Sequence, residues 1–189
     1  MSSCPKPANN SAGFTLVELM VGLAVFAILA VVGIPSMNSF ISSNRLTSQA
    51  NEFLSALQFA RAEAVRLNRN ILFCNTSDAQ TCNVSTGKWE AWLILDPTTN
   101  NVLRTSLIAN DSINVLSDNG ISQDSIVFNS MGLVRNRVNI RQAQEGVIRV
   151  CIENASSPNY RDVRFRSGGQ IEVVKPTTAA GACVKPGSL

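Results

Sequence analysis

The sequence contains no histidine, and only 15% of its residues are charged. Histidine is the usual general base at neutral pH and the commonest zinc ligand, so its absence argues against most hydrolytic and zinc-dependent chemistry. The chain also has no recognisable pairing of a nucleophile with a base, no glycine-rich phosphate loop and no carboxylate cluster. We therefore predict that the protein is not an enzyme and uses no cofactor or metal.

Apolar residues are instead abundant, at 45% of the chain, and they are concentrated near its start. The run from Phe14 to Met37 contains a single charged residue, Glu18. As a helix this run is long enough to cross about 30 Å of hydrocarbon. A secretory signal fits poorly, because only Lys6 precedes the run and the run exceeds the apolar region of such a signal. Residues 14–36 are therefore predicted to form a transmembrane helix.

Glu18 is the exception that this apolar helix must accommodate. A carboxylate in a membrane helix costs about 2.5 to 3.5 kcal/mol at mid-membrane, and less near an end, so it calls for a positive partner. Cleavage between Gly13 and Phe14 would create an α-amino group one helical turn before Glu18. In a stack of such helices, the amine of one subunit can pair with Glu18 of the next. The simpler alternative is a stray polar residue near the end of a plain anchor.

The residues around this point carry a specific resemblance. The stretch Gly13-Phe14-Thr15-Leu16-Val17-Glu18 resembles the processing site of type IV pilins and type II secretion pseudopilins. The resemblance implies a leader peptide, residues 1–13, which a prepilin peptidase removes before methylating Phe14. It also implies that Glu18 assists docking into a filament.

A second helical segment is predicted after the apolar run. Gly33 and Pro35 interrupt the run, and a proline inside a helix removes a hydrogen bond, so a kink is expected there. Apolar residues then recur at helical spacing, which predicts an amphipathic helix over residues 37–68, packed on a domain. The recurring residues are Leu46, Ala50, Phe53, Leu54, Leu57, Ala60 and Ala64. Pro35 is thus an assembly candidate; alternatively, it marks where the anchor ends.

Residues 69–189 change to short β-prone runs separated by turn-rich stretches. The runs are ILFC, WEAWLIL, NVLRTSLI, SINVL, SIVFN, VIRVCIE, RDVRFR and QIEVV. No helical crossover separates them, so an antiparallel sheet or sandwich is expected. The predicted fold class is α+β, with a long, partly transmembrane N-terminal helix packed on a β-rich periplasmic domain.

Three further stretches narrow the resemblance to the GspH/FimT group of minor pilins and pseudopilins. Residues 60–65 (ARAEAV), 87–96 (GKWEAWLILD) and 126–132 (IVFNSMG) are similar, in that order, to segments of that group, although Ala91 replaces a usual glycine. The resemblance implies the pilin fold and is strongest to minor pilins of the FimU/FimT type. For Trp89 and Trp92, packing in the core is favoured over a ligand-binding aromatic pair.

Four cysteines follow the apolar run, and export makes disulfides the expected state. Of the three pairings that four cysteines allow, we predict Cys74 with Cys82 and Cys151 with Cys183. Closure over eight positions is geometrically easy, and the second bond would fix the C-terminal tail. A zinc site is the competing interpretation, but the sequence contains no C-x-x-C pair.

A basic stretch between Arg135 and Lys175 offers a second kind of partner, because a basic surface attracts nucleic acid. Some FimT-like proteins bind DNA through a C-terminal G-R-x-R motif. Here Gln170 and Glu172 replace the two arginines of that motif. Nucleic acid is therefore the less favoured partner, and the solvated-face interpretation is preferred; the DNA-binding candidates are Arg161, Arg164 and Arg166.

The predicted function is that of a minor type IV pilin, which assembles with other minor and major pilins to prime or cap the pilus. Its expected partners also include the prepilin peptidase, the inner-membrane assembly platform and membrane lipid. The expected location is the inner membrane, with one span and a periplasmic domain, and later the filament or its tip. The alternatives are a GspH-type pseudopilin of a type II secretion system and a FimT-like DNA-binding pilin.

Overall fold

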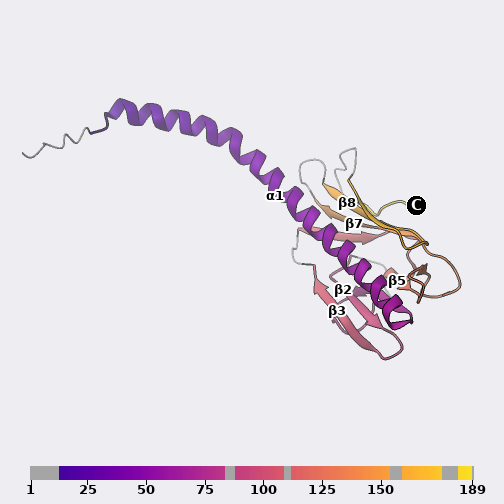
Figure 1. Cartoon of the computed structure of the whole chain (residues 1–189). Helices are drawn as coiled ribbons and strands as arrows, with labels where there is room; N and C mark the ends of the chain where they lie inside the picture. Colours follow the sequence, from indigo (N-terminus) through magenta and orange to yellow (C-terminus); the bar gives the residue numbers. More distant parts are fainter. Residues whose placement is uncertain (1–12, 84–87, 109–111, 154–158, 176–182, 189) are drawn as a thin grey trace, which may run out of the picture. The chain divides into compact units, whose positions relative to one another are not determined.

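The computed structural model describes residues 13–83, 88–108, 112–153, 159–175 and 183–188 (Figure 1). The side chains of residues 32–36 are not among those described. The chain divides into two units, Met1–Asn38 and Ser39–Leu189. Apart from Gly13, the predicted leader lies outside the described residues.

The helix α1, Leu16–Leu67, begins in the first unit and ends in the second. It continues through Pro35, so the predicted resumption of the helix is confirmed, while the kink stays a prediction. The residue that follows the helix, Asn68, is a non-glycine residue in the left-handed region (φ 53°). The N–H groups of Asn68 and Arg69 donate to the carbonyls of Val65 and Ala64, at 3.3 and 3.1 Å. These two bonds form a Schellman motif, which satisfies carbonyls at the helix end.

In the first unit, the apolar side chains of α1 lie in the open around the helix. Phe14, Leu16 and Phe26 are 89%, 74% and 69% exposed. Among the residues described with their side chains, no helical stretch combines the length and the apolar character needed to cross a membrane.

In the second unit, one face of α1 packs into the main core. Leu46, Ala50, Phe53, Leu57 and Ala60 are each at most 1% exposed. They recur at three- and four-residue steps, which places them on one side of a helix. The amphipathic periodicity predicted for this segment therefore marks the surface that the β-strands cover.

Nine strands form two antiparallel sheets in the described part of the second unit. The five-stranded sheet has the order β3-β2-β1-β5-β6. Its strands are β1 (Ile71–Thr76), β2 (Ala91–Asp96), β3 (Asn101–Leu107), β5 (Ser125–Phe128) and β6 (Val134–Arg135). A short 3-10 helix, η1 (Ser122–Asp124), precedes β5.

The four-stranded sheet has the order β4-β7-β8-β9. Its strands are β4 (Ile113–Ser117), β7 (Gly146–Ile152), β8 (Tyr160–Phe165) and β9 (Ile171–Val174). Side chains of both sheets and of α1 share one hydrophobic core. Figure 1 shows β7 and β8 beside one stretch of α1 and β2 beside another, so the helix joins the two sheets.

Aromatic rings fill the core where α1 meets the five-stranded sheet. Trp89 and Trp92 are fully buried, as predicted for packing residues. Phe73 lies between them, with its ring centroid 5.7 Å from that of Trp89 and 5.8 Å from that of Trp92. The Trp92 indole N–H donates to Glu52 Oε1 of α1 at 3.2 Å. Trp89 and Trp92 therefore contribute apolar contacts to the core, and Trp92 adds one hydrogen bond to the helix.

Candidate assembly site

The start of α1 is fixed by a reciprocal pair of residues, Thr15 and Glu18. The backbone N–H and the hydroxyl of Thr15 donate to Glu18 Oε2 at 3.1 and 3.0 Å, and the Glu18 N–H donates to Thr15 Oγ1 at 3.2 Å. This arrangement is a capping box, in which two side chains satisfy the free N–H groups of a helix start. The carboxylate is thereby held beside the first turn and stays exposed.

Gly13 precedes this turn and has no packing role in the described structure. A Cβ added to Gly13 would meet no atom within 4 Å, and the residue is exposed. The fold therefore does not require glycine here, in contrast to Gly169 in the second unit. If glycine is required at position 13, the requirement must come from recognition by a processing enzyme.

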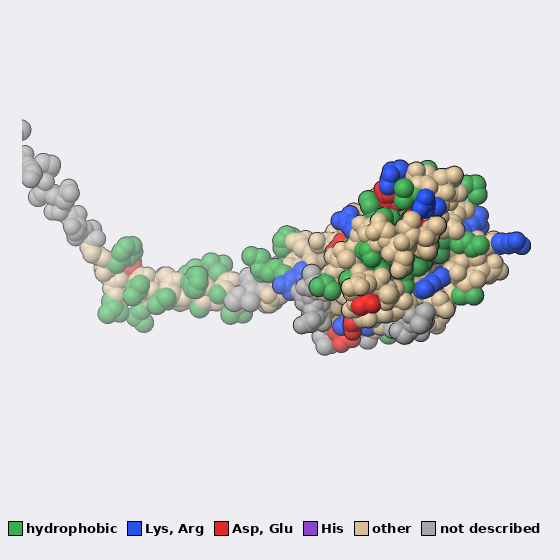
Figure 2. Space-filling model, turned by 90° about the horizontal axis from the view of Figure 1, so that it is seen from below, with side chains coloured by type: hydrophobic (Ala, Val, Ile, Leu, Met, Phe, Trp, Pro, Cys, Tyr) green, Lys and Arg blue, Asp and Glu red, His purple; other side chains and the backbone are tan. Residues whose placement is uncertain are grey.

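Figure 2 shows apolar side chains along the visible face of the first part of α1, with red acidic atoms near its start. The exposed apolar residues here are Phe14, just before the helix, and within it Leu16, Val17, Leu19, Met20, Val21, Leu23, Val25, Phe26, Ile28, Leu29 and Val31. Large exposed apolar surfaces mark contacts with other proteins or with lipid. The first unit thus combines a helix that is apolar on all sides with one accessible carboxylate.

In the second unit, Arg61 brings three distant segments together. Its Nη1 donates to the carbonyl oxygen of Gly169 at 2.8 Å, and its side chain also lies against Gly132. Both glycines have positive φ, 72° at Gly132 and 82° at Gly169. A Cβ at Gly169 would lie 2.5 Å from Gly132 O and 2.8 Å from Arg61 Cζ. Glycine is therefore required at Gly169 both by its backbone angle and by the close approach.

The structure pairs the four cysteines as predicted, Cys74 with Cys82 and Cys151 with Cys183. The paired Cα atoms are 5.6 and 5.7 Å apart, within the range that a disulfide spans. The first bond closes the loop after β1, and the second attaches the C-terminal residues 183–188 to β7.

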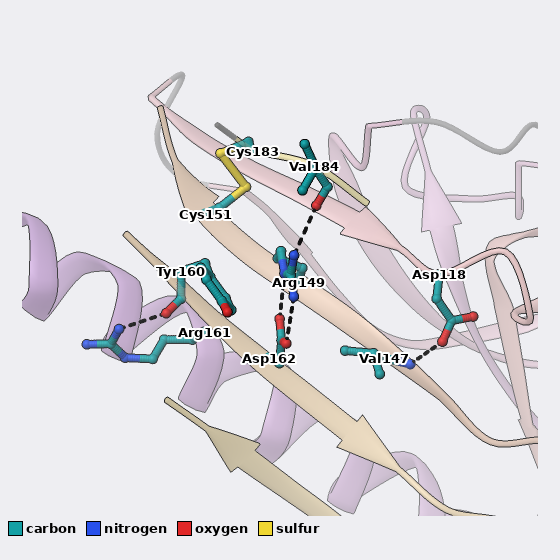
Figure 3. Close-up of polar contacts among 9 residues, drawn as sticks. All are labelled: Asp118, Val147, Arg149, Cys151, Tyr160, Arg161, Asp162, Cys183 and Val184. Atoms are coloured by element: carbon teal, nitrogen blue, oxygen red, sulfur yellow. Dashed lines mark hydrogen bonds and ion pairs between the residues drawn. A yellow bond between two sulfur atoms is a disulfide. The ribbon is translucent and has the colours of Figure 1, made fainter. Parts of the chain in front are cut away.

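The C-terminal attachment is reinforced by Arg149 on β7 (Figure 3). Its guanidinium makes a two-pronged ion pair with Asp162 on β8, at 2.7 and 2.9 Å, and donates to the carbonyl of Val184 at 3.3 Å. The guanidinium carbon also lies 4.1 Å from the ring centroid of Tyr160. Hydrogen bonding to Asp162 raises the pKa of Arg149, so the guanidinium stays charged. Arg149 therefore links both strands and the tail.

The three predicted DNA-binding arginines do not share one surface. Arg161 is only 2% exposed and faces the core with Val163 and Phe165, because alternate residues of a strand point to the same side. It donates to the Tyr160 carbonyl at 2.8 Å and to Ser43 Oγ of α1 at 3.0 Å, and burial lowers its pKa. Arg164 is half-buried and Arg166 is exposed. A phosphate group has no access to Arg161 in this arrangement.

A long helix packed on antiparallel sheets is the architecture of pilins, and solved structures of that class match it. Two crystal structures of the type IV minor pilin FimU of Pseudomonas aeruginosa (strain PAO1), in different space groups, superpose with TM-scores of 0.56 and 0.52. Each is 20% identical to this chain; the first covers 77% of this chain and 99% of its own, and the second covers 74% and 100%. The structure therefore confirms the predicted pilin fold.

Sequence comparisons identify the family. The family described as “Type II transport protein GspH” matches residues 49–169, and the “Prokaryotic N-terminal methylation motif” matches residues 8–34. The chain belongs to this GspH family of type IV pilin-like proteins. A relative, the “Type IV major alpha-pilin” of Moraxella bovis, is 23% identical over 167 residues, which are 87% of this chain and 99% of the relative. These are structural proteins and not enzymes, as predicted.

The capping box is a feature that our sequence analysis missed. The pattern Thr15-Leu16-Val17-Glu18 is a standard signal for a helix start, and it precedes an apolar run. The role of Arg61 was also missed, and for a different reason. Its partner Gly169 is 108 residues away, so no local pattern reveals the contact.

Proposed function

We propose that this chain is a minor type IV pilin, which joins other minor pilins and the major pilin to prime or cap the filament. The observation that carries the proposal is the first turn of α1, where Glu18 is held exposed on a helix that is apolar on all sides. A filament supplies what both features need, apolar neighbours for the helix and an amine for the carboxylate. The role is structural: the helix packs and the globular unit is displayed.

Processing precedes assembly in this proposal. A prepilin peptidase cuts between Gly13 and Phe14 and methylates the new N-terminus. The match to the N-terminal methylation motif supports this step, and so does the exposure of Gly13. The liberated amine of one protomer would then pair with Glu18 of the next, which removes the cost of an unpaired carboxylate in an apolar filament core.

The proposed location follows from the helix and the disulfides. Before assembly the apolar helix would lie in the lipid of the inner membrane, with the Ser39–Leu189 unit in the periplasm. Two disulfides suit an oxidising compartment such as the periplasm. An assembly platform in the membrane would then transfer the helix from lipid into the filament. Pro35, inside α1, would adjust the helix to its neighbours.

Complementation of a deletion strain tests the proposal. The wild-type chain should restore surface pili, whereas Glu18→Ala should be processed at Gly13 but absent from sheared filaments. Glu145→Ala, which removes an exposed carboxylate of the second unit, is the matched control and should restore pili. Normal filament incorporation of Glu18→Ala, or mass spectrometry showing an intact Met1 start, would overturn the proposal.

A second candidate, a pseudopilin of a type II secretion system, is favoured by the description of the matching family. The same strains distinguish the two functions. Loss of pili with normal secretion of exoproteins supports the pilin, and normal pili with lost secretion supports the pseudopilin. A DNA-binding role at the pilus tip has less support, because Arg161 is buried and Gln170 and Glu172 occupy the positions of the motif arginines.

A further inference from the structure

The five-stranded sheet carries a pocket of about 420 Å³ on the face that does not pack on α1. Its floor consists of Leu95 on β2, Leu72 on β1 and Val127 on β5. Leu72 is the register partner of both Leu95 and Val127, so the three side chains form a row across neighbouring strands. They are 5–7% exposed and belong to a small apolar cluster separate from the main core.

Loops from three parts of the chain form the walls. Thr81 and Cys82 belong to the loop that the first disulfide closes, and Pro97 belongs to the turn between β2 and β3. Arg137 and Ile140 follow β6. The pocket is thus built by tertiary contacts, and its volume lies in the range of about 300 to 1,000 Å³ typical of small-molecule sites.

Arg137 is the charged residue of the pocket. It is half-buried, its Nη1 donates to Ser125 Oγ at 2.9 Å, and burial lowers its pKa, although a guanidinium remains protonated. None of the described lining residues is acidic. A partly desolvated cation therefore lies beside an apolar floor.

Two carboxylates lie close to the pocket residues in the sequence, Asp96 at the end of β2 and Asp78 in the disulfide loop, and both are already paired. Asp96 forms an ion pair with Arg69 at 3.0 Å and accepts the Thr98 N–H at 2.9 Å. Asp78 accepts hydrogen bonds within its own loop, from the Gln80 and Thr81 N–H groups at 2.8 and 2.7 Å. Neither carboxylate lines the pocket. Among the hydrogen bonds and ion pairs of the described residues, neither carboxylate contacts Arg137.

We propose that this pocket binds a small aliphatic carboxylate, with the carboxylate on Arg137 and the alkyl chain over Leu72, Leu95 and Val127. The anion would restore the interactions that the guanidinium loses on burial, through charge-assisted hydrogen bonds. The alkyl chain would cover apolar surface that the fold leaves open. This binding site is independent of the filament role of α1, because none of its residues belongs to the helix.

Binding of radiolabelled octanoate to the full processed protein in amphipol, with amphipol alone as the blank, tests the proposal. Wild type should show saturable binding, and Arg137→Gln should bind at least about tenfold more weakly. Arg135→Gln is the matched control, because Arg135 pairs with Val127 in register but does not line the pocket. It should retain wild-type affinity within about threefold.

A second pair of variants tests the same pocket without touching its charge. Ile140→Trp should fill the pocket and abolish octanoate binding, whereas Val138→Trp, two residues away and 72% exposed, should not. Near-UV circular dichroism and the disulfide map establish that each variant folds. If Arg137→Gln does not fold, the comparison of Ile140→Trp with Val138→Trp tests the proposal. Octanol, the uncharged analogue, should bind at least about tenfold more weakly. No saturable octanoate binding, equal binding of octanol, or unchanged binding by folded Arg137→Gln or Ile140→Trp would overturn the proposal.

Discussion

Arg61 on α1 donates a hydrogen bond of 2.8 Å to the carbonyl of Gly169, across 108 positions of the sequence. Gly169 lies in the turn between β8 and β9, and the same arginine packs against Gly132 in the turn after β5. Both sheets are thereby attached to the helix at one point. The family match begins on α1 and ends at residue 169, so it contains all three segments.

Replacing Arg61 with alanine is expected to lower the free energy of unfolding by about 1 to 3 kcal/mol, because a half-buried carbonyl loses a charged donor and the turns lose a packing surface. Arg66→Ala is the matched control on the same helix. Arg66 pairs with Glu63 at the surface, where solvent screens the charges, so Arg66→Ala should change the stability much less. Urea unfolding of the processed protein measures the free energy of unfolding of both variants. Equal destabilisation by the two would contradict the role of Arg61 in attaching the sheets to the helix.

Gly169 and Gly168 are adjacent glycines for which opposite results are expected. Gly169→Ala places a Cβ 2.5 Å from Gly132 O at φ +82°, and the positive φ alone costs about 1 to 2 kcal/mol. At Gly168 a Cβ would meet nothing within 4 Å, so Gly168→Ala should change stability by less than about 0.5 kcal/mol. Thermal unfolding measures the stability of both variants. A Gly169→Ala variant as stable as Gly168→Ala would show that the contact of Gly169 with Gly132 and Arg61 tolerates a side chain.

Local patterns predicted most elements of this fold. Each of the eight β-prone runs overlaps one strand, because alternation and turn residues are local signals. The missed strand, β6, has only two residues and carries no periodicity. The division into two sheets was left open as well, because it depends on distant pairings such as β1 with β5 and β4 with β7. Such pairings leave no pattern in a single sequence.

The arginines of β8 show where the prediction failed although a local signal existed. The basic residues between Arg135 and Lys175 were considered as a possible DNA-binding surface, although a solvated face was preferred, and both interpretations place Arg161 outside the core. However, Arg161 alternates with Val163 and Phe165, two apolar residues of the core-facing side. Strand periodicity therefore predicts an inward-facing Arg161, and charge alone did not.

The two disulfides should differ in their contribution to stability. In the loop-entropy description, stabilisation grows with the length of the closed loop, and the sequence separations are 8 and 32. The longer loop should contribute about 1.2 kcal/mol more at 25 °C. Comparison of Cys74→Ala/Cys82→Ala with Cys151→Ala/Cys183→Ala by urea unfolding checks the difference. Each pair joins one buried and one half-buried cysteine, so similar side-chain burial is removed in both. A larger loss in the first variant would contradict loop length as the cause.

Asp78 should make the disulfide loop sensitive to acid. Hydrogen bonds from the Thr81 and Gln80 N–H groups lower the pKa of its carboxyl well below the ordinary value. A carboxyl with a lowered folded pKa stabilises the fold above its unfolded pKa of about 3.9, and this contribution is lost as the pH falls further. Asp78→Asn lacks the titrating group. The stability difference between wild type and Asp78→Asn should therefore shrink between about pH 6 and about pH 2.5. A difference that is constant with pH would contradict the assignment, and an NMR titration of the Asp78 carboxyl measures the pKa directly.

Thr15 and Glu18 allow the cap of α1 to be separated from the charge that assembly is proposed to use. Thr15→Val removes the capping hydroxyl and keeps the carboxylate, and it should destabilise the first helical turn by about 0.5 to 2 kcal/mol. Glu18→Gln keeps a side chain that completes a capping box but removes the charge. Hydrogen exchange of the first-turn amides should therefore accelerate in Thr15→Val and stay near wild type in Glu18→Gln. If pairing with a neighbouring amine drives assembly, Glu18→Gln should be lost from sheared filaments while Thr15→Val is still incorporated. The reverse pattern, with Glu18→Gln in the filament and Thr15→Val excluded, would assign Glu18 to helix capping alone.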